Sequence, residues 1–367
     1  MERGRNLLAV VPGSFVSGAE LLLLRDLDAA RSAGWGVRVA CSDGPLVERL
    51  AHCDIERIAI PDLRLGEGPK PLAAGRLAST TLGAARALRR DRRSSELLLV
   101  NGVNALPAAV LARQGRPVVL FAHDVLVRRD RLTLARLARR AVRGAIAVSD
   151  ATAQPLRALG MNATVARQGT EWPVAPAQPS AEPVRIGIAA ALSEWKGHRV
   201  VLDAVARMEH REVALEIMGA APPKERVYEA ELRIGAAQPA LDGRVHFLGF
   251  VADPLTRMRT WTAAVVASTE PEAGPLVALE AMSIGVPVVA TDHGGVREVL
   301  GDAGVLVPAG NAAALANALD RLLGDAVLYA RCRAAGPPRI VDEHLTRAEH
   351  EQRFVAALDE LSGAASA

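Results

Sequence analysis

The sequence predicts an α/β protein built from two Rossmann-like, doubly wound domains that face each other across a central cleft. Its 367 residues exceed one ordinary core and suit two domains of roughly 150–200 residues each. Short, almost wholly apolar runs alternate with longer amphipathic stretches in both halves, which is typical of a parallel sheet covered by helices on both faces. A stretch with four prolines, WPVAPAQPSAEP, separates the halves. We therefore expect a first domain over residues 1–172, a linker over 173–183 and a second domain over 184–343.

The first half alternates apolar strands with helical patterns. The expected strands are Leu7–Val11, Val37–Cys41, Ile55–Ile60, Leu97–Val100, Val118–Ala122, Ala145–Val148 and Thr164–Ala166. The expected helices are Ala19–Ser32, Leu72–Arg89, Leu132–Val142 and Ala151–Leu159.

After the Pro-rich stretch the alternation restarts. The expected strands are Val184–Ala189, Ala214–Met218, Val245–Leu248, Ala263–Val266 and Pro287–Ala290. The expected helices are Lys196–Met208, Pro275–Ile284, Ala312–Leu323 and His344–Leu361. Since the halves share one architecture, a ligand is expected in the cleft at the carboxyl ends of their strands.

The composition is that of a soluble globular protein, with 50% hydrophobic and 23% charged residues. Aromatic residues make up only 3%, which argues against a protein that stacks on single-stranded nucleic acid. Three widely spaced cysteines form neither a disulfide framework nor a metal pattern, so a cytoplasmic location is expected. The apolar run LLAVV before Pro12 is too short for a signal peptide, and no run approaches the ~20 residues that span a bilayer.

Two carboxylates stand close together in the second half. The helical pattern from Pro275 to Ile284 is apolar apart from Glu280 and Ser283, so it is expected to be buried. A buried carboxylate without a partner costs several kcal/mol, so Glu280 needs a donor from the protein or from a ligand hydroxyl group. Glu272 precedes it by eight residues, about 12 Å along a helix. Paired carboxylates that hydrolyse glycosides lie roughly 5–9.5 Å apart, so hydrolysis by this pair is not expected.

A rare lysine follows the strand Val184–Ala189. Lysine occurs three times among 44 basic residues, so Lys196 stands out where arginine is the default. A strand-to-helix turn at the carboxyl end of a sheet directs backbone amides toward the ligand, and Lys196 adds a full positive charge. The turn is therefore suited to binding a phosphate group or another anion.

The passage Glu270–Thr291, EPEAGPLVALEAMSIGVPVVAT, resembles the signature of the retaining glycosyltransferases of family 4. The shared features are Glu-x7-Glu followed by Ala-Met, then Gly-Val-Pro, and then Gly-Gly-x-x-Glu ending at Glu298. The resemblance implies that Glu272 lies by the donor sugar and that Glu280 binds the ribose hydroxyl groups. Gly274-Pro275 stands where Phe-Gly is usual, which keeps small residues beside the sugar. The donor-binding positions that it implies are Gly197, Gly274, Pro275, Leu276, Val277, Gly294 and Gly295.

The Lys196-Gly197 pair matches the family's Lys-Gly, where an arginine and the lysine together hold the diphosphate. In this sequence Ala191 stands where the arginine is expected. In the first domain, Ser17-Gly18-Ala19-Glu20 resembles the family's Gly-Gly-Ala-Glu turn, which places Gly18 in the site. His123 ends the strand Val118–Ala122, and a histidine in this position of the family touches the donor sugar.

The resemblance implies the GT-B fold, with an N-terminal acceptor domain, a C-terminal donor domain and a last helix, 344–361, that packs back on the first domain. It also implies transfer of a sugar from a nucleoside diphosphate sugar to a hydroxyl acceptor, with retention. Our hypothesis is front-face attack, in which the departing diphosphate accepts the proton of the acceptor. Lys196, Glu272 and His123 are the expected catalytic residues. No cofactor and no essential metal are expected, and Asp26-x-Asp28 is interpreted as a solvated helix face.

Three alternatives stay open at this stage. Ala191 and Ser17 motivate a degenerate relative that binds a nucleotide sugar without turnover. A sugar-nucleotide epimerase of the same fold is the second, although its acidic and histidine set is not evident. The basic run Arg128–Arg143 is most simply a solvated face, but it also permits weak association with an anionic membrane surface, at the inner face of the membrane.

Overall fold

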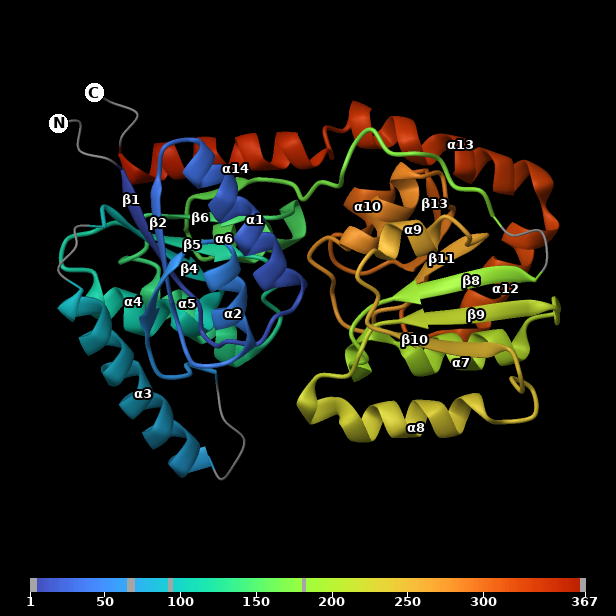
Figure 1. The fold of residues 1–367 in the computed structure, drawn as a ribbon, viewed down its shortest axis with the longest axis horizontal. Helices are drawn as coiled ribbons and strands as arrows, with labels where there is room; N and C mark the ends of the chain where they lie inside the picture. Colours follow the sequence, from blue (N-terminus) through green and yellow to red (C-terminus); the bar gives the residue numbers. More distant parts are fainter. Residues whose placement is uncertain (1–4, 65–69, 92–94, 180–182, 364–367) are drawn as a thin grey trace. The chain divides into compact units, whose positions relative to one another are not determined.

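The structure is a computed structural model that describes residues 5–64, 70–91, 95–179 and 183–363. It divides the chain into two units, each built around a parallel sheet with helices on both faces (Figure 1). The first unit comprises residues 1–167 and 351–367, and the second comprises residues 168–350.

The first unit contains a seven-stranded sheet in the order β3-β2-β1-β4-β5-β6-β7. All neighbouring strands pair in parallel. Its strands are β1 (Asn6–Val10), β2 (Gly36–Cys41), β3 (Glu56–Ala59), β4 (Leu97–Asn101), β5 (Val118–Ala122), β6 (Gly144–Ala147) and β7 (Ala163–Val165). Because the central strands are buried on both faces, they read as unbroken apolar runs in the sequence.

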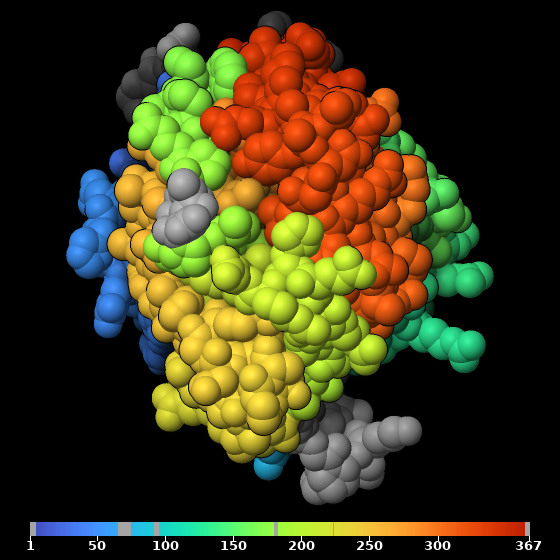
Figure 2. All heavy atoms as spheres, turned by 90° about the vertical axis from the view of Figure 1, so that its right-hand side faces the viewer, coloured from blue at the N-terminus to red at the C-terminus, as the bar shows by residue number. Residues whose placement is uncertain are grey.

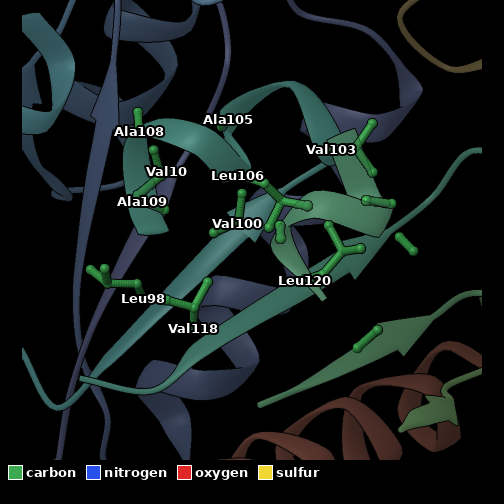
Figure 3. Packing of buried hydrophobic residues seen from close by; sticks show 14 of the residues in the cluster. Val10, Leu98, Val100, Val103, Ala105, Leu106, Ala108, Ala109, Val118 and Leu120 are labelled. Atoms are coloured by element: carbon green, nitrogen blue, oxygen red, sulfur yellow. The ribbon is translucent and has the colours of Figure 1, made fainter. Parts of the chain in front are cut away.

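Helices cover both faces of this sheet. They are α1 (Gly18–Ser32), α2 (Pro45–His52), α3 (Lys70–Arg90), α4 (Leu106–Ala112), α5 (Arg129–Ala138) and α6 (Asp150–Ala158), with the 3-10 turn η1 (Val103–Ala105) before α4. On one face, Leu98 and Val100 of β4 and Leu120 of β5 pack against Ala105 and Leu106 (Figure 3). On the other face, Phe121 makes an edge-to-face contact with Phe354 of α14 (Arg347–Ser362), at 5.4 Å between the ring centroids.

The second unit contains a six-stranded parallel sheet in the order β10-β9-β8-β11-β12-β13. The strands are β8 (Val184–Ala189), β9 (Val213–Met218), β10 (Val245–Gly249), β11 (Ala263–Val266), β12 (Val288–Thr291) and β13 (Gly304–Val307). Its helices are α7 (His198–Arg207), α8 (Arg226–Ala236), α9 (Pro254–Met258), α10 (Leu276–Ser283), α11 (Val296–Leu300), α12 (Ala312–Gly324) and α13 (Ala326–Asp342), with 3-10 turns η2 (Glu194–Lys196) and η3 (Pro223–Glu225).

Two apolar cores flank the second sheet. Ile186 and Leu215 face the core beneath α7, α8 and α12, whereas Ala264 and Val288 face the core beneath α9, α10 and α13. Helices α7 and α12 lie in contact, and Figure 2 shows the orange-red surface of the segment with α12 and α13 adjoining yellow-green residues of the segment with α7 and β9.

A buried carboxylate interrupts the otherwise apolar strand β9. Glu216 is fully buried and accepts hydrogen bonds from Arg185 Nη1 at 2.7 Å, Arg257 Nε at 2.7 Å and Trp261 Nε1 at 2.8 Å. Burial by itself would raise the pKa of Glu216, but the donors from Arg257, Trp261 and Arg185 outweigh it and hold the pKa below its usual value. Glu216 therefore stays ionised inside the sheet, because both of its carboxylate oxygens accept hydrogen bonds.

Several element boundaries differ from the sequence predictions. The helix expected to start at Lys196 starts at His198, because Gly197 has φ 75° and ends a separate 3-10 turn. Helix α10 starts at Leu276, and Pro275 is its N-cap residue with an extended ψ of 108°. The helix expected over Leu132–Val142 spans Arg129–Ala138, and the last helix begins at Arg347.

The Pro-rich stretch that the sequence suggested as a linker belongs to the second unit. Ala177 is buried, and its N–H donates to the Ile284 carbonyl at 2.7 Å. Arg333 Nη2 donates to the Ala177 carbonyl at 2.8 Å. These bonds fasten this part of the stretch to the core that contains α10 and α13.

In each sheet, the strand order reverses direction once. The reversal lies between β1 and β4 in the first unit and between β8 and β11 in the second. Loops that leave neighbouring strands in opposite directions open a crevice at the carboxyl ends, where ligands bind in doubly wound sheets. Ligand-binding residues are therefore expected in the segments after β1, β4 and β5, and in those after β8, β11 and β12.

Candidate functional site

Lys196 and Glu272 come together at the reversal point of the second sheet. Lys196 ends the turn η2 after β8, and Glu272 lies in the loop after β11. Lys196 Nζ is 2.6 Å from Glu272 Oε1, and Ser268 Oγ donates to the same oxygen at 2.5 Å. Glu272 is almost buried, while the Lys196 side chain keeps 21% exposure. The ammonium group is thus positioned by a buried carboxylate, on a side chain that is partly exposed.

The indole of Trp195 supports the same ammonium group. Lys196 Nζ lies 3.8 Å from the centroid of the Trp195 ring, within the range of a cation–π contact. The Trp195 carbonyl accepts from the backbone N–H of Thr269 at 2.8 Å, which joins the turn η2 to the loop after β11. These contacts hold the Lys196 side chain at the carboxyl end of β8 in the second sheet.

Two glycines permit the close backbone approaches that build this region. Gly197 has φ 75°, and a Cβ there would lie 1.9 Å from the Ala267 carbonyl oxygen. Gly294 has φ 64°, and a Cβ there would lie 2.2 Å from the Glu272 carbonyl oxygen. That carbonyl accepts from Gly295 N–H at 2.7 Å, so the segments after β11 and β12 are bridged at Glu272. Only glycine combines this φ with the absence of a side chain.

The amino end of α10 has backbone N–H groups without a side-chain cap. Its N-cap residue, Pro275, offers no side-chain hydrogen bond, and the first intrahelical donors are Ala278 and Leu279. The N–H groups of Leu276 and Val277 therefore lie in the first turn, where the helix dipole favours an anion. Gly274 precedes these two residues. A Cβ at Gly274 would lie 3.5 Å from Gln168 Oε1, which is an ordinary van der Waals contact, so the fold has room for a side chain there.

Glu280 is half-buried, in contrast to the full burial that the apolar helix pattern predicted. The buried residues of α10 are Ala278, Leu279, Ala281, Met282 and Ser283. Leu276, Val277 and Glu280 stand at i, i+1 and i+4, so they share the less covered face of the helix. This face presents the carboxylate of Glu280 one helical turn after two aliphatic side chains.

Ala191 is exposed at the carboxyl end of β8, in the position where the sequence resemblance led us to expect arginine. Its neighbours Ala190 and Leu192 are held by backbone hydrogen bonds to Met218 and Ala220. The backbone is thus fixed by its neighbours while Ala191 is exposed, so a longer side chain can extend into solvent.

His198 is a buried residue of this region that the sequence did not reveal. It opens α7 directly after Gly197, it is fully buried, and neither ring nitrogen has a hydrogen-bond partner among the described residues. Burial, reinforced by the charge of Lys196, lowers the pKa of His198 to about 4. The ring is therefore neutral at pH 7 and adds no charge beside the lysine.

This shift predicts a stability that falls on acidification. The pKa of His198 is lower in the folded than in the unfolded protein. Its contribution to the free energy of unfolding is therefore complete above pH ~6.5, the usual pKa of unfolded histidine, and is lost as the pH falls through about 4. Between pH 7 and pH 5, the free energy of unfolding should drop by about 2 kcal/mol through this group. Denaturant unfolding of His198→Phe should lack this component, whereas the exposed His246→Gln should keep it. An unchanged pH dependence in His198→Phe would contradict the assignment.

In the first unit, Gly18 opens α1 after β1. Ser17 is the N-cap: its side chain accepts from Ala19 N–H, and Glu20 accepts from the backbone N–H of Ser17 at 3.0 Å. Gly18 does not have a positive φ, and a Cβ there would meet nothing within 4 Å. The fold therefore does not require glycine at this position, and the space beside its Cα is open.

Gly18→Ala is accordingly expected to leave the free energy of unfolding unchanged or to raise it by up to ~1 kcal/mol, because alanine restricts the unfolded chain and favours a helix. If Gly18 lines a ligand site, the same variant weakens ligand binding without any loss of stability. Thermal unfolding and donor titration on one preparation separate the two effects. A destabilised variant would show that the glycine is structural.

His123 directly follows β5, and its side chain is 11% exposed. Its ring lies edge-to-face with Phe121, at 6.0 Å between centroids, and Nδ1 is 3.8 Å from Asp124 Oδ1. Burial by itself would lower the pKa of His123, but the carboxylate of Asp124 outweighs burial and the pKa is raised. Neither ring nitrogen has a hydrogen-bond partner within the described part of the chain.

Two asparagines in the segment from the end of β4 to η1 were missed by the sequence predictions. Asn101 ends β4 and is 1% exposed, and Asn104 lies in η1. The amide atoms of Asn101 and Oδ1 of Asn104 are buried without hydrogen-bond partners in the described ranges. The only signal in the sequence was a polar residue at the end of an apolar run.

Two further observations bear on the expected chemistry. Within the described ranges, no group of three or more His, Cys, Asp or Glu side chains is placed to hold a metal ion. No helix in the described ranges is long and apolar enough to cross a membrane.

Both halves of the chain match known families of proteins. The profile of the family described as "Glycosyl transferases group 1" matches residues 183–325, and that of "Glycosyltransferase Family 4" matches residues 16–169. The phosphatidyl-myo-inositol mannosyltransferase of Mycobacterium leprae is 40% identical over 147 residues, which are 38% of this chain and 37% of that protein. The putative colanic acid biosynthesis glycosyltransferase WcaL of Escherichia coli is 31% identical over 189 residues, 47% of this chain and 45% of that protein. The matches thus span less than half the length of these relatives.

Solved structures share the fold over nearly the whole chain. HepE of Anabaena, determined in complex with UDP and glucose, superposes with a TM-score of 0.79 and 25% identity, covering 96% of this chain and 99% of that one. The sucrose-phosphate synthase of Thermosynechococcus elongatus gives a TM-score of 0.80 at 21% identity, covering 98% and 100%. Two parallel-sheet units with these matches establish the GT-B fold. The chain belongs to the family 4 glycosyltransferases of the GT-B fold.

Proposed function

We propose that this protein transfers a sugar from a nucleoside diphosphate sugar to a hydroxyl acceptor, with retention of the anomeric configuration. The observation that carries the proposal is the meeting of Lys196, Glu272 and the amino end of α10 at the reversal point of the second sheet. This arrangement offers a positioned cation and free amides to a diphosphate, and a carboxylate to the attached sugar.

In this proposal Lys196 and the N–H groups of Leu276 and Val277 stabilise the charge that grows on the departing diphosphate. Glu272 holds Lys196 in place and faces the sugar, while Glu280 on the half-covered face of α10 accepts hydrogen bonds from the ribose. Gly197, Gly274, Gly294 and Gly295 let the backbone approach the ligand. No separate base is required if the departing diphosphate takes the proton of the acceptor, so placement and charge supply the catalysis.

The donor is proposed to carry UDP in the first instance. Support comes from the Anabaena protein, whose structures were determined with UDP and with UDP-glucose at 25% and 24% identity over nearly the full chain. Titration calorimetry with UDP, GDP, ADP and dTDP and their glucose or mannose esters tests the choice. Binding of none of these nucleotides would refute the proposed function.

Turnover is tested with a donor labelled in the sugar. Label should appear in a glycosylated acceptor or, without acceptor, slowly as free sugar, and NMR of the new anomeric proton reports retention or inversion. A lipid-linked glycan, an envelope polysaccharide and a small aglycone are the acceptor classes to screen. We further propose that no metal takes part, so excess EDTA should leave the rate unchanged.

The alternative function is nucleotide-sugar binding without turnover, and exposed Ala191 is the observation that favours it. Ala191→Arg distinguishes the two. Because the side chain enters solvent at a fixed backbone position, its guanidinium can pair with a diphosphate, and we expect kcat to rise up to about tenfold, as for one charge-assisted hydrogen bond. Ala190→Arg, on the neighbouring residue, is the control. A native protein that binds donor but turns over only as Ala191→Arg would favour the binding function.

A further inference from the structure

Helix α8 of the second unit carries an apolar stripe on its outer side. Val227 is 71% exposed and Ile234 is 76% exposed, so most of each side chain lies in solvent. Ala230 and Ala237 are exposed as well, and the four residues together are called the α8 stripe. The buried residues of α8 lie on the other side of the helix, against the unit. In Figure 1, α8 runs along the lower margin of the second unit.

The spacing of the α8 stripe is that of a coiled-coil seam. Its residues stand at i, i+3, i+7 and i+10, which are the a and d positions of two successive heptads, with Val227 and Ile234 at a. Valine and isoleucine at a are typical of parallel, two-stranded coiled coils. A single exposed apolar residue is common on protein surfaces, but four in one row form a face that fits another helix.

The charges beside the α8 stripe suit a second copy of the same helix. Arg226 precedes the first a position, which makes it a g residue, and Glu231 follows the first d position, which makes it an e residue. In a parallel pair, the g residues of one helix face the e residues of the other. Arg226 would thus meet Glu231 of the second copy, and a two-fold axis repeats the contact.

Both charged groups are available for this contact. Among the described residues, no side chain pairs with the Arg226 guanidinium. Glu231 is 47% exposed and binds Arg199 of α7 through Oε2, which leaves Oε1 free to accept. Arg233, the second g residue, is already paired with Glu229 of its own helix at 2.8 Å. Arg226 and Glu231 are therefore the two charges that a second copy can use.

The same charges argue against a lipid surface as the occupant. Helix α8 contains two arginines and two glutamates, so its net charge is zero. A helix that lies on an anionic membrane carries an excess of basic residues on its polar face. A contact between identical surfaces instead needs both signs on one surface, and α8 has them on opposite sides of the stripe.

We propose that the α8 stripe is a self-association surface, through which two copies of this chain pair their α8 helices in parallel about a two-fold axis. The inference goes beyond the proposed function and does not depend on it. Two short helices bury much less than the ~1,200 Å² of a standard interface. The association is therefore weak and reversible, with a dissociation constant between about 10 µM and about 1 mM.

Sedimentation equilibrium of the full chain, from about 5 µM to about 500 µM, measures the association. The native protein should shift from monomer toward dimer as its concentration rises, and Ile234→Glu should associate about tenfold less tightly or worse. Val327→Glu is the matched control, because Val327 is 81% exposed on α13 of the same unit. It should associate like the native protein. Circular dichroism and melting temperatures of both variants should match the native values, since both positions are exposed.

Charge exchange tests the parallel register. In a parallel pair, Arg226→Glu places glutamates opposite each other, and Glu231→Arg places arginines opposite each other. Each variant alone should therefore associate about fivefold less tightly or worse, because two attractive pairs become repulsive. An equimolar mixture of the two variants restores two opposite-charge pairs, so the mixed dimer should form as readily as the native dimer. Native mass spectrometry distinguishes the mixed dimer from the two symmetric ones.

Four outcomes would overturn the proposal. The native protein remains monomeric at about 500 µM. Ile234→Glu dimerises as well as the native protein, which places the interface elsewhere. Arg226→Glu associates more tightly than the native protein, as expected for an antiparallel pair whose g residues face each other. The native protein, but not Ile234→Glu, floats with vesicles of phosphatidylglycerol and phosphatidylcholine and stays monomeric without them, which assigns the stripe to a membrane.

Discussion

Replacing Lys196 with methionine is expected to lower kcat/KM for sugar transfer by about 10²–10³-fold, the usual effect of removing one charged group that stabilises a transition state. Methionine keeps an unbranched stem beside the Trp195 ring but removes the ammonium group that lies 2.6 Å from Glu272. Most of the loss should appear in kcat, since the diphosphate gains charge as the bond to the sugar breaks. Initial rates over a range of donor concentrations measure it.

A paired variant separates catalysis from stability. Lys196→Met leaves the nearly buried Glu272 without its cation, which by itself should lower the free energy of unfolding by about 1–3 kcal/mol. Adding Glu272→Gln removes the unpaired charge, so the double variant should regain much of this stability while activity stays low. Arg211→Met, at the amino-terminal edge of the same sheet, controls for the loss of one positive charge. Recovery of activity together with stability would show that Lys196 acts only through the fold.

The second large effect is expected for Gly294→Ala, which should lower the free energy of unfolding by about 2–5 kcal/mol. Two costs add: a left-handed φ of 64° for a residue with a side chain, and a Cβ placed 2.2 Å from the Glu272 carbonyl oxygen. Because the clash is with backbone, the segments after β11 and β12 must separate, and Glu272 moves with them. Activity should therefore fall more than stability alone explains at temperatures well below unfolding.

Gly310→Ala is the matched control for this prediction. Gly310 has φ 72°, close to that of Gly294, but a Cβ there meets nothing within 4 Å. It should therefore show the conformational cost alone, about 1–2 kcal/mol, with unchanged activity. Equal destabilisation of the two variants in urea unfolding would show that the contact with Glu272 adds nothing.

The strands were predictable because burial of both faces leaves a continuous apolar run in the sequence itself. A strand in a parallel sheet buries both faces, so β5 and β11 appear in the sequence as apolar runs with the bounds found in the structure. Helix α13 (Ala326–Asp342) was not predicted from the sequence. Helix α13 runs through Pro337 and Pro338, although proline removes a backbone donor. The Arg333 carbonyl, which loses its partner to Pro337, lies beside Gly285, so tertiary packing makes room where local propensity forbids a helix.

The site shows the same division. The sequence by itself determined which residue types follow the strands: a lysine among arginines, two carboxylates eight residues apart and glycines at the turns. Only the tertiary structure decided that Lys196 pairs with Glu272, 76 positions away, because the order of strands in the sheet brings β8 beside β11. It also decided that Glu280 lies on a half-covered face and that the buried amide of Asn101 finds no hydrogen-bond partner among the described residues. Burial and hydrogen-bond satisfaction are properties of the packed chain, and a sequence supplies the donors and acceptors without stating which of them meet.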